Sequence, residues 1–171
     1  MPMQRLIPLV AAATALSPLV LTAAPASAAA ATSGVVHVYA VNSGGSTGTI
    51  VVTGAIGDWG KDISGASPTT NQIVLSKGSF DVNTAAIGRA FSKAKPKGDP
   101  ANCGVVLAVS APATLSNGTG AYKGISGKVN LTVSNAALLP TKSDGTCDET
   151  PSSVALGELT ITQGSGTIAI K

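Results

Sequence analysis

The chain has 171 residues, of which 44% are hydrophobic and only 11% charged, and its formal net charge is +3. This positive charge is too small to argue for nucleic-acid binding, which usually requires a concentrated basic face. We interpret the one local concentration of cations, Arg89–Lys97, as a solvated loop, with a site for an anionic partner as the alternative.

The first 28 residues have the pattern of an export signal. A single cation, Arg5, precedes a low-charge apolar run at residues 6–21, and small residues at A-x-A spacing end the segment at Ala28. Two prolines interrupt the run, which is shorter than the roughly 20 apolar residues that a membrane-spanning helix needs. We therefore expect cleavage after Ala28, a secreted protein without a transmembrane segment, and one mature domain at residues 29–171 with a net charge of +2.

Two early segments have the composition of β-strands, and a loop follows them. β-Branched residues are dense in Val35–Val41, which predicts the first strand. Larger aliphatic residues alternate with other residues in Thr49–Ile56, which predicts a second strand with its aliphatic side toward the core. Residues 57–71 break every period and contain three glycines and Pro68, so we predict a loop there.

The rest of the chain predicts further strands joined by short turns. Alternation indicates six of them, at Gln72–Ser76, Ser79–Asn83, Val105–Leu115, Lys128–Ser134, Val154–Thr162 and Gly166–Lys171. Asn117-Gly118 is a hairpin signal, and residues 84–100 favour a short helical turn at most, followed by an exposed loop. Pro112 marks an edge position, a bend or the end of its strand.

About eight strands, almost no helix and short glycine-rich turns are typical of an all-β protein, either an antiparallel β-barrel or a β-sandwich. We favour the eight-stranded barrel because closure removes every exposed strand edge. Gly124 and Gly127 also permit the tight coiling that closure needs. Such a barrel has a lumen wide enough for side chains or for one small ligand.

The two cysteines of an exported protein predict one disulfide, Cys103–Cys147. The closed loop has 45 residues, for which the loss of chain entropy gives at most about 4 kcal/mol of stabilisation. A CxxC pair is absent and the chain has a single histidine, so we expect neither a metal site nor a cofactor.

The segment Gly118–Gly127, GTGAYKGISG, resembles the GTG-x-[FY]-x-G-x-x-G segment of the allene oxide cyclase and dirigent barrel superfamily. Its four glycines, Thr119 and Tyr122 carry the match. Together with the earlier stretch GTIVVTGAIGDWG, it is also similar to exported proteins of high-GC Gram-positive bacteria. The resemblance implies an eight-stranded antiparallel barrel with an apolar lumen. It implies no catalytic set, because no motif places the acidic residues of dirigent proteins on this sequence.

Two residues of the first strand are candidates for ligand binding. His37 and Tyr39 face the lumen together if the odd positions of the strand point inward. If the even positions point inward, Val36, Val38 and Ala40 fill the core instead, and the alternation cannot choose between the two registers. A lumenal His37 would serve as a base or as a ligand donor near neutral pH.

A second candidate group lies in the predicted loop that follows the second strand, and so at a barrel mouth. Its members are Asp58, Trp59, Lys61 and Asp62. Trp59 would stack on a ligand there while the charges orient it; in the alternative, Trp59 closes the barrel end and the charged residues cap turns. We interpret Tyr122 as a packing aromatic that shields the neighbouring glycines, rather than as a proton donor.

The sequence contains no GxSxG, HExxH or phosphate-loop motif, and all eight acidic residues fall in predicted loops or on outward strand positions. We therefore favour a secreted barrel that binds an apolar or amphipathic small molecule, or a surface partner, without catalysis. One alternative is an isomerase-, cyclase- or dirigent-type enzyme that holds a reactive intermediate in the lumen. Another is a structural protein of the cell envelope.

Overall fold

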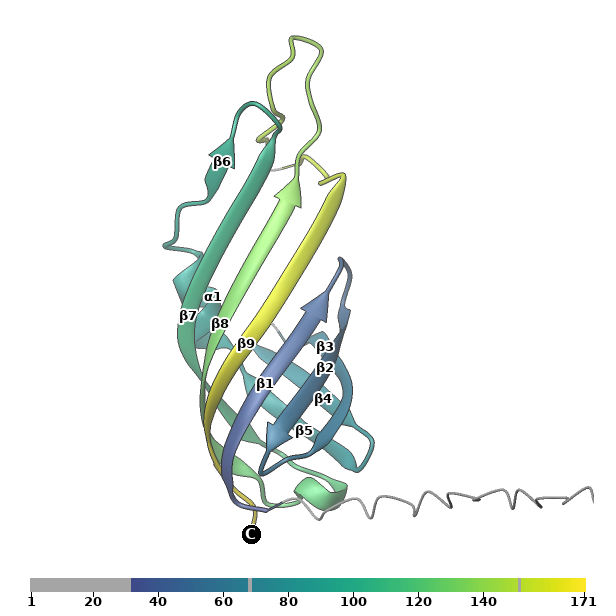
Figure 1. Cartoon of the computed structure of the whole chain (residues 1–171), viewed down its shortest axis with the longest axis vertical. Helices are drawn as coiled ribbons and strands as arrows, with labels where there is room; N and C mark the ends of the chain where they lie inside the picture. Colours follow the sequence, from purple (N-terminus) through teal and green to yellow (C-terminus); the bar gives the residue numbers. More distant parts are fainter. Residues whose placement is uncertain (1–31, 68, 151) are drawn as a thin grey trace, which may run out of the picture.

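The structure, a computed structural model, describes residues 32–67, 69–150 and 152–171 (Figure 1). The predicted export signal, residues 1–28, lies outside the described residues. The described strands are β1 (Gly34–Asn42), β2 (Thr47–Gly54), β3 (Asp58–Ser67), β4 (Thr70–Leu75), β5 (Gly78–Asn83), β6 (Lys97–Asp99), β7 (Gly104–Ser116), β8 (Ser126–Leu138) and β9 (Gly157–Ala169). The helical segments are the α-helix α1 (Ala85–Phe91) and the 3-10 helix η1 (Gly120–Tyr122).

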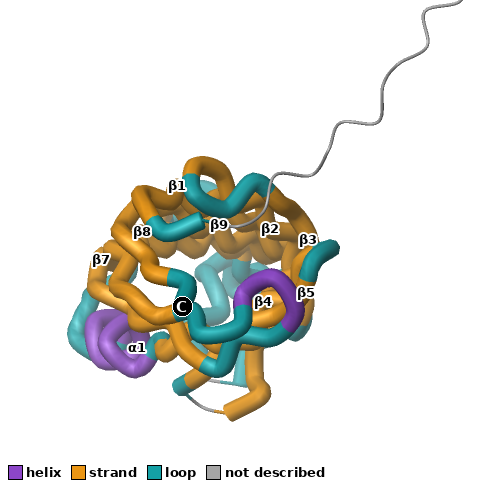
Figure 2. The backbone as a smooth tube through the Cα atoms, turned by 90° about the horizontal axis from the view of Figure 1, so that it is seen from below, coloured by secondary structure: helices purple, strands orange, loops and turns teal. Residues whose placement is uncertain are grey.

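Strand pairing closes the sheet into a barrel. Neighbouring strands are antiparallel in the order β5-β4-β3-β2-β1-β9-β8-β7, and β5 at one end also pairs with β7 at the other. The eight strands therefore form a ring, which is seen end-on in Figure 2. The predicted eight-stranded antiparallel barrel is confirmed, in preference to a sandwich. β6 is an additional strand that pairs with β7 outside this ring.

Alternating side chains divide the inside of the barrel from its outside. In β8, Val129 and Leu131 are buried, whereas Lys128 and Asn130 are exposed, as the alternation predicts. The same alternation buries Ile50 and Val52 of β2 and both apolar residues of β5. The largest fully buried side chains are Tyr122, Ile56, Ile168 and Val36. The core therefore lies inside the ring.

The strands β7, β8 and β9 have 13 residues each and extend past the other strands at the upper end of Figure 1. β6 and the long β8–β9 connection lie at this extension. The predicted disulfide is confirmed, with the sulfur atoms of Cys103 and Cys147 2.08 Å apart. It joins the residue before β7 to the β8–β9 connection, and so it ties the extension together.

Helix α1 occupies a gap beside β7. β7 pairs with β6 at its start and with β5 at its end, so its middle has β8 as its only strand partner in the described part. α1 packs against β7 and buries Ile87. Pro112 lies in this middle part, at the edge position that proline needs within a sheet. No helix in the described ranges is long and apolar enough to cross a membrane.

The predicted loop at residues 57–71 is wrong for most of its length, because residues 58–67 form β3. This strand pairs with β2 on one side and with β4 on the other. Its inward side chains are those of Asp58, Asp62 and Ser64, while Trp59 is exposed on the outer face. The strand therefore lacks the hydrophobic alternation from which strands are recognised.

The last two predicted strands, residues 154–162 and 166–171, are one strand, β9. Gly164 and Gly166 lie within the ladder, where a Cβ on Gly164 would come 2.1 Å from the carbonyl oxygen of Asn130. Glycine therefore lets β9 approach β8 closely. One strand, β3, was not predicted, and one strand, β9, was predicted as two. The predicted number of strands therefore equals the number in the ring.

The glycine-rich segment Gly118–Gly127 joins β7 to β8 across the lower end of the barrel. A Cβ on Gly118 would lie 1.8 Å from the carbonyl oxygen of Tyr122, so only glycine fits there. The Thr119 N–H donates to the Ser79 carbonyl (2.8 Å), and the Ser79 N–H donates to Thr119 Oγ1 (2.9 Å). These contacts fix the connection to β5 and carry Tyr122 into the barrel end.

Candidate ligand-binding cavity

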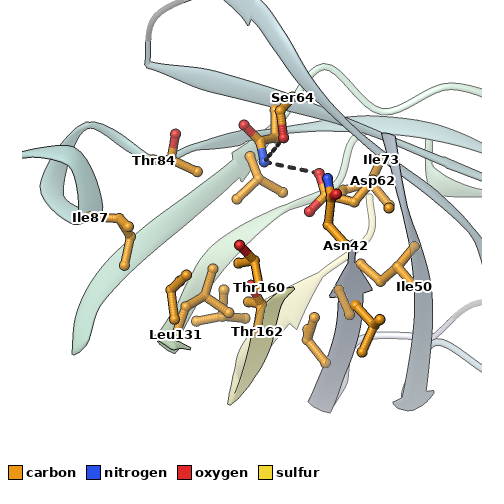
Figure 3. A pocket seen from close by; sticks show the side chains of 18 of the residues that line it. Asn42, Ile50, Asp62, Ser64, Ile73, Thr84, Ile87, Leu131, Thr160 and Thr162 are labelled. Atoms are coloured by element: carbon orange, nitrogen blue, oxygen red, sulfur yellow. Dashed lines mark hydrogen bonds between the residues drawn. The ribbon is translucent and has the colours of Figure 1, made fainter. Parts of the chain in front are cut away.

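The barrel encloses a cavity of about 370 Å³ (Figure 3). This volume is within the range of about 300–1,000 Å³ that is typical of small-molecule sites. Its wall is mainly aliphatic and includes Val36, Val38, Ala40, Ile50, Val52, Ile73, Val82, Leu131 and Val133. Helix α1 contributes Ile87. The inward side chains therefore leave part of the lumen unfilled.

The lower end of the barrel is closed by a hydrogen-bonded carboxylate. Asp58, at the start of β3, is 8% exposed. It accepts hydrogen bonds from Ser76 Oγ (2.6 Å), from the Trp59 N–H (2.8 Å), from the Lys77 N–H (3.1 Å) and from the Tyr122 hydroxyl. Its partners come from β3, from the β4–β5 turn and from η1, so one carboxylate joins three segments.

Hydrogen bonding and burial set the ionisation of this closed end. Burial raises the pKa of Asp58, but the hydrogen bonds from Ser76, Tyr122 and two backbone N–H groups together outweigh it and lower this pKa from 3.8 to about 2. Burial and the neighbouring carboxylate raise the pKa of Tyr122. Tyr122 also packs edge-to-face on Phe80, with ring centroids 5.5 Å apart. It is the packing aromatic that we predicted, and it is in addition a hydrogen-bond donor.

The opposite end of the cavity is lined by polar side chains. Asn42 of β1, Asp62 and Ser64 of β3, and Thr160 of β9 lie there (Figure 3). Asn71 Nδ2 donates to Asp62 Oδ1 (2.9 Å) and, more weakly, to Ser64 Oγ (3.5 Å). Burial raises the pKa of Asp62, and the hydrogen bond from Asn71 counteracts this. We call this end the polar mouth.

The structure places His37 and Tyr39 on the outer face. β1 directs its even positions inward, so Val36 and Ala40 are buried and Tyr39 is 52% exposed. This settles the register that the alternation left open. Neither His37 nor Tyr39 lines the cavity.

The group Asp58–Asp62 is divided by the alternation of β3. Trp59 is 66% exposed and Lys61 also faces outward, so Trp59 neither reaches the cavity nor closes the barrel. Asp58 and Asp62 face inward toward opposite ends, which corrects the prediction that every acidic residue points outward or lies in a loop. Asp62 is the one predicted ligand-binding residue that lines the cavity.

Sequence reasoning missed several polar residues of the mouth, among them Asn42, Ser64, Asn71 and Thr160. Asn42 continues the even-numbered inward series of β1, and this was the available signal for it. Asn71 was placed in the predicted loop. Thr160 belongs to a strand whose outward positions carry the larger residues, among them Ile161, which is 44% exposed. Hydrophobicity therefore gives the wrong orientation for β9.

Among the described residues, no group of three or more His, Cys, Asp or Glu side chains is placed to hold a metal ion. Comparison of the chain with protein-family models, with curated proteins and with solved structures finds no match.

Proposed function

We propose that this protein is a secreted β-barrel that binds one small apolar or amphipathic molecule in its lumen without changing it chemically. The observation that supports this most strongly is the cavity of about 370 Å³, with aliphatic walls, one closed end and one polar mouth. Each methylene group buried in such a cavity contributes about 0.8 kcal/mol, or about fourfold in affinity. A purely structural envelope protein would have no need of such a cavity.

Export is part of this proposal. The disulfide Cys103–Cys147 suits an oxidising compartment, and the pattern of residues 1–28 predicts the signal that would lead there. The relationship with allene oxide cyclase and dirigent barrels likewise stays a prediction, one with which the eight-stranded ring agrees. N-terminal sequencing of the protein recovered from culture medium tests export, with Ala29 expected as the first residue.

Binding is tested by isothermal titration of single-chain amphiphiles into the protein. We expect one site per chain. Affinity should fall at least about tenfold in Val38→Phe, because the added ring displaces about two methylene groups of the ligand from the cavity, which costs about 1.6 kcal/mol. Val35→Phe is the matched control, since Val35 is on the same strand but 55% exposed on the outer face. Absence of binding by amphiphiles of every head group would refute the proposed function.

A second candidate function is an isomerase- or cyclase-type enzyme, and Asp62 is the observation that favours it. A carboxyl group whose pKa is raised by burial beside an apolar cavity is suited to general acid–base catalysis. Chromatography of a bound ligand after prolonged incubation separates the two functions. Recovery of the unchanged ligand supports binding alone, whereas conversion by the native protein and not by Asp62→Asn would establish the enzyme.

A further inference from the structure

At the polar mouth, Asn42 of β1 and Asp62 of β3 lie on either side of Gly48 of β2, which has no side chain. Asp62 of β3 pairs with Gly48 of β2, and a Cβ on Gly48 would lie 3.2 Å from the Cβ of Asn42 on β1. Because Gly48 has no side chain, β2 places no side chain between Asn42 and Asp62, which are both labelled in Figure 3. Two strand spacings place their Cα atoms roughly 9–10 Å apart, which leaves room between the side chains for a small head group.

Asn42, which lines the cavity beside this gap, has an unused hydrogen-bond acceptor. Its Nδ2 group donates to the carbonyl oxygen of Gly45 (3.1 Å), which fixes the orientation of the amide. Its Oδ1 atom is buried and accepts no hydrogen bond from any described residue. A buried acceptor without a donor is unfavourable, and a ligand whose head group reaches this atom would supply the donor.

The charges of the mouth are negative. Asp62 and Glu158 line the cavity, whereas its lining in the described part contains no Lys, Arg or His. Asp62 accepts one hydrogen bond, from Asn71, and Glu158 accepts one from Asn135 Nδ2 (2.7 Å). Both donors are neutral amides, so neither hydrogen bond neutralises a carboxylate.

We infer that the ligand is a single-chain amphiphile with a primary ammonium head, which binds between Asn42 and Asp62 while its tail occupies the aliphatic part of the lumen. This inference rests on the proposed function and names its ligand class. An ammonium group has three donors and no acceptor, which matches a mouth that offers a carboxylate and an unused amide oxygen. A carboxylate, sulfate or phosphate head would meet two negative charges and no cation among the lining residues.

The test is isothermal titration of three probes with the same tail, octylamine, octanol and octanoate, near neutral pH and at low salt. We expect octylamine to bind about tenfold more tightly than octanol, because one charge-assisted hydrogen bond contributes about 1.4 kcal/mol or more. Octanoate should bind at least about tenfold more weakly than octanol. Equal affinities for the three would overturn the inference and leave the proposed function standing, whereas no binding by any of them would refute both.

Variants locate the head group. Asp62→Asn keeps the size of the side chain and removes its charge, so it should abolish the roughly tenfold preference for octylamine over octanol. Retained octanol binding also shows that the variant is folded. Asp81→Asn is the matched control, because Asp81 is on β5 next to the inward Phe80 and faces outward. An octylamine preference that survives in Asp62→Asn would contradict the proposed position of the head group.

Discussion

The hydrogen bond from Tyr122 to Asp58 should stabilise the fold through a single atom, the phenolic oxygen. Tyr122→Phe removes this donor from a carboxylate that is 8% exposed and keeps the ring against Phe80. Hydrogen bonds to charged groups contribute about 1.5–3 kcal/mol. Because three other donors remain on Asp58, we expect the free energy of unfolding to fall by about 2 kcal/mol, or about 6 °C in melting temperature.

The effect of this variant should depend on pH. The pKa of Asp58 is lowered from 3.8 to about 2, so its ionised form stabilises the fold above the ordinary pKa, and this stabilisation is lost as the pH falls through about 2. The two pKa values correspond to about 2 kcal/mol. Tyr122→Phe removes one of the causes of the lowered pKa, so its stability deficit should be smaller near pH 2 than near pH 7.

Urea unfolding at the two pH values measures both quantities. Tyr39→Phe is the control, because it deletes the same hydroxyl from a ring that is 52% exposed on the outer face, and it should change stability by less than about 0.5 kcal/mol. Equal losses in Tyr122→Phe and Tyr39→Phe would refute the reasoning. A loss in Tyr122→Phe that is the same at both pH values would refute its electrostatic part.

Three further predictions concern other parts of the molecule. Burial raises the pKa of Asp62, so ionisation of this carboxyl group destabilises the fold above that pKa. Asp62→Asn should therefore raise the melting temperature near pH 7, and this gain should vanish below pH 3.8. A lower melting temperature of Asp62→Asn near pH 7 would contradict this prediction. Gly118→Ala should destabilise by about 1–3 kcal/mol, measured by urea unfolding, whereas a Cβ on Gly57 meets nothing within 4 Å and Gly57→Ala should be nearly neutral. Thiol titration of the denatured, unreduced protein should find no free cysteine. Two titratable thiols in the denatured, unreduced protein would disprove the bridge. Replacement of both Cys103 and Cys147 by Ser should lower the free energy of unfolding by up to about 4 kcal/mol without changing octylamine affinity.

The sequence predicts the barrel well because most strands carry their own evidence. Over residues 128–134 of β8 the apolar positions alternate, so both the strand and its inner face follow from local pattern. β3 is not predicted from local pattern because its inner face carries Asp58 and Asp62, and an aspartate does not by itself indicate a buried position. The ladders with β2 and β4 hold it in the sheet, and those contacts are not local.

The candidate site is less predictable than the fold for the same reason. Asp58 and Tyr122 are 64 residues apart in the chain, and nothing near either residue indicates the other. The orientation of His37 depends on a register that either face of β1 could satisfy. The gap between Asn42 and Asp62 depends on a glycine of the strand between them, so it becomes visible only when the strands are paired.

The most direct test of lumenal binding is the dependence of affinity on chain length in a series of linear primary amines, measured by isothermal titration. Affinity should rise about fourfold per methylene group until the cavity of about 370 Å³ is full, and then level off. In Val38→Phe, whose added ring occupies the same space, it should level off at a shorter chain. Affinity that rises without limit, or a series that is identical in the native protein and in Val38→Phe, would show that the chains bind elsewhere.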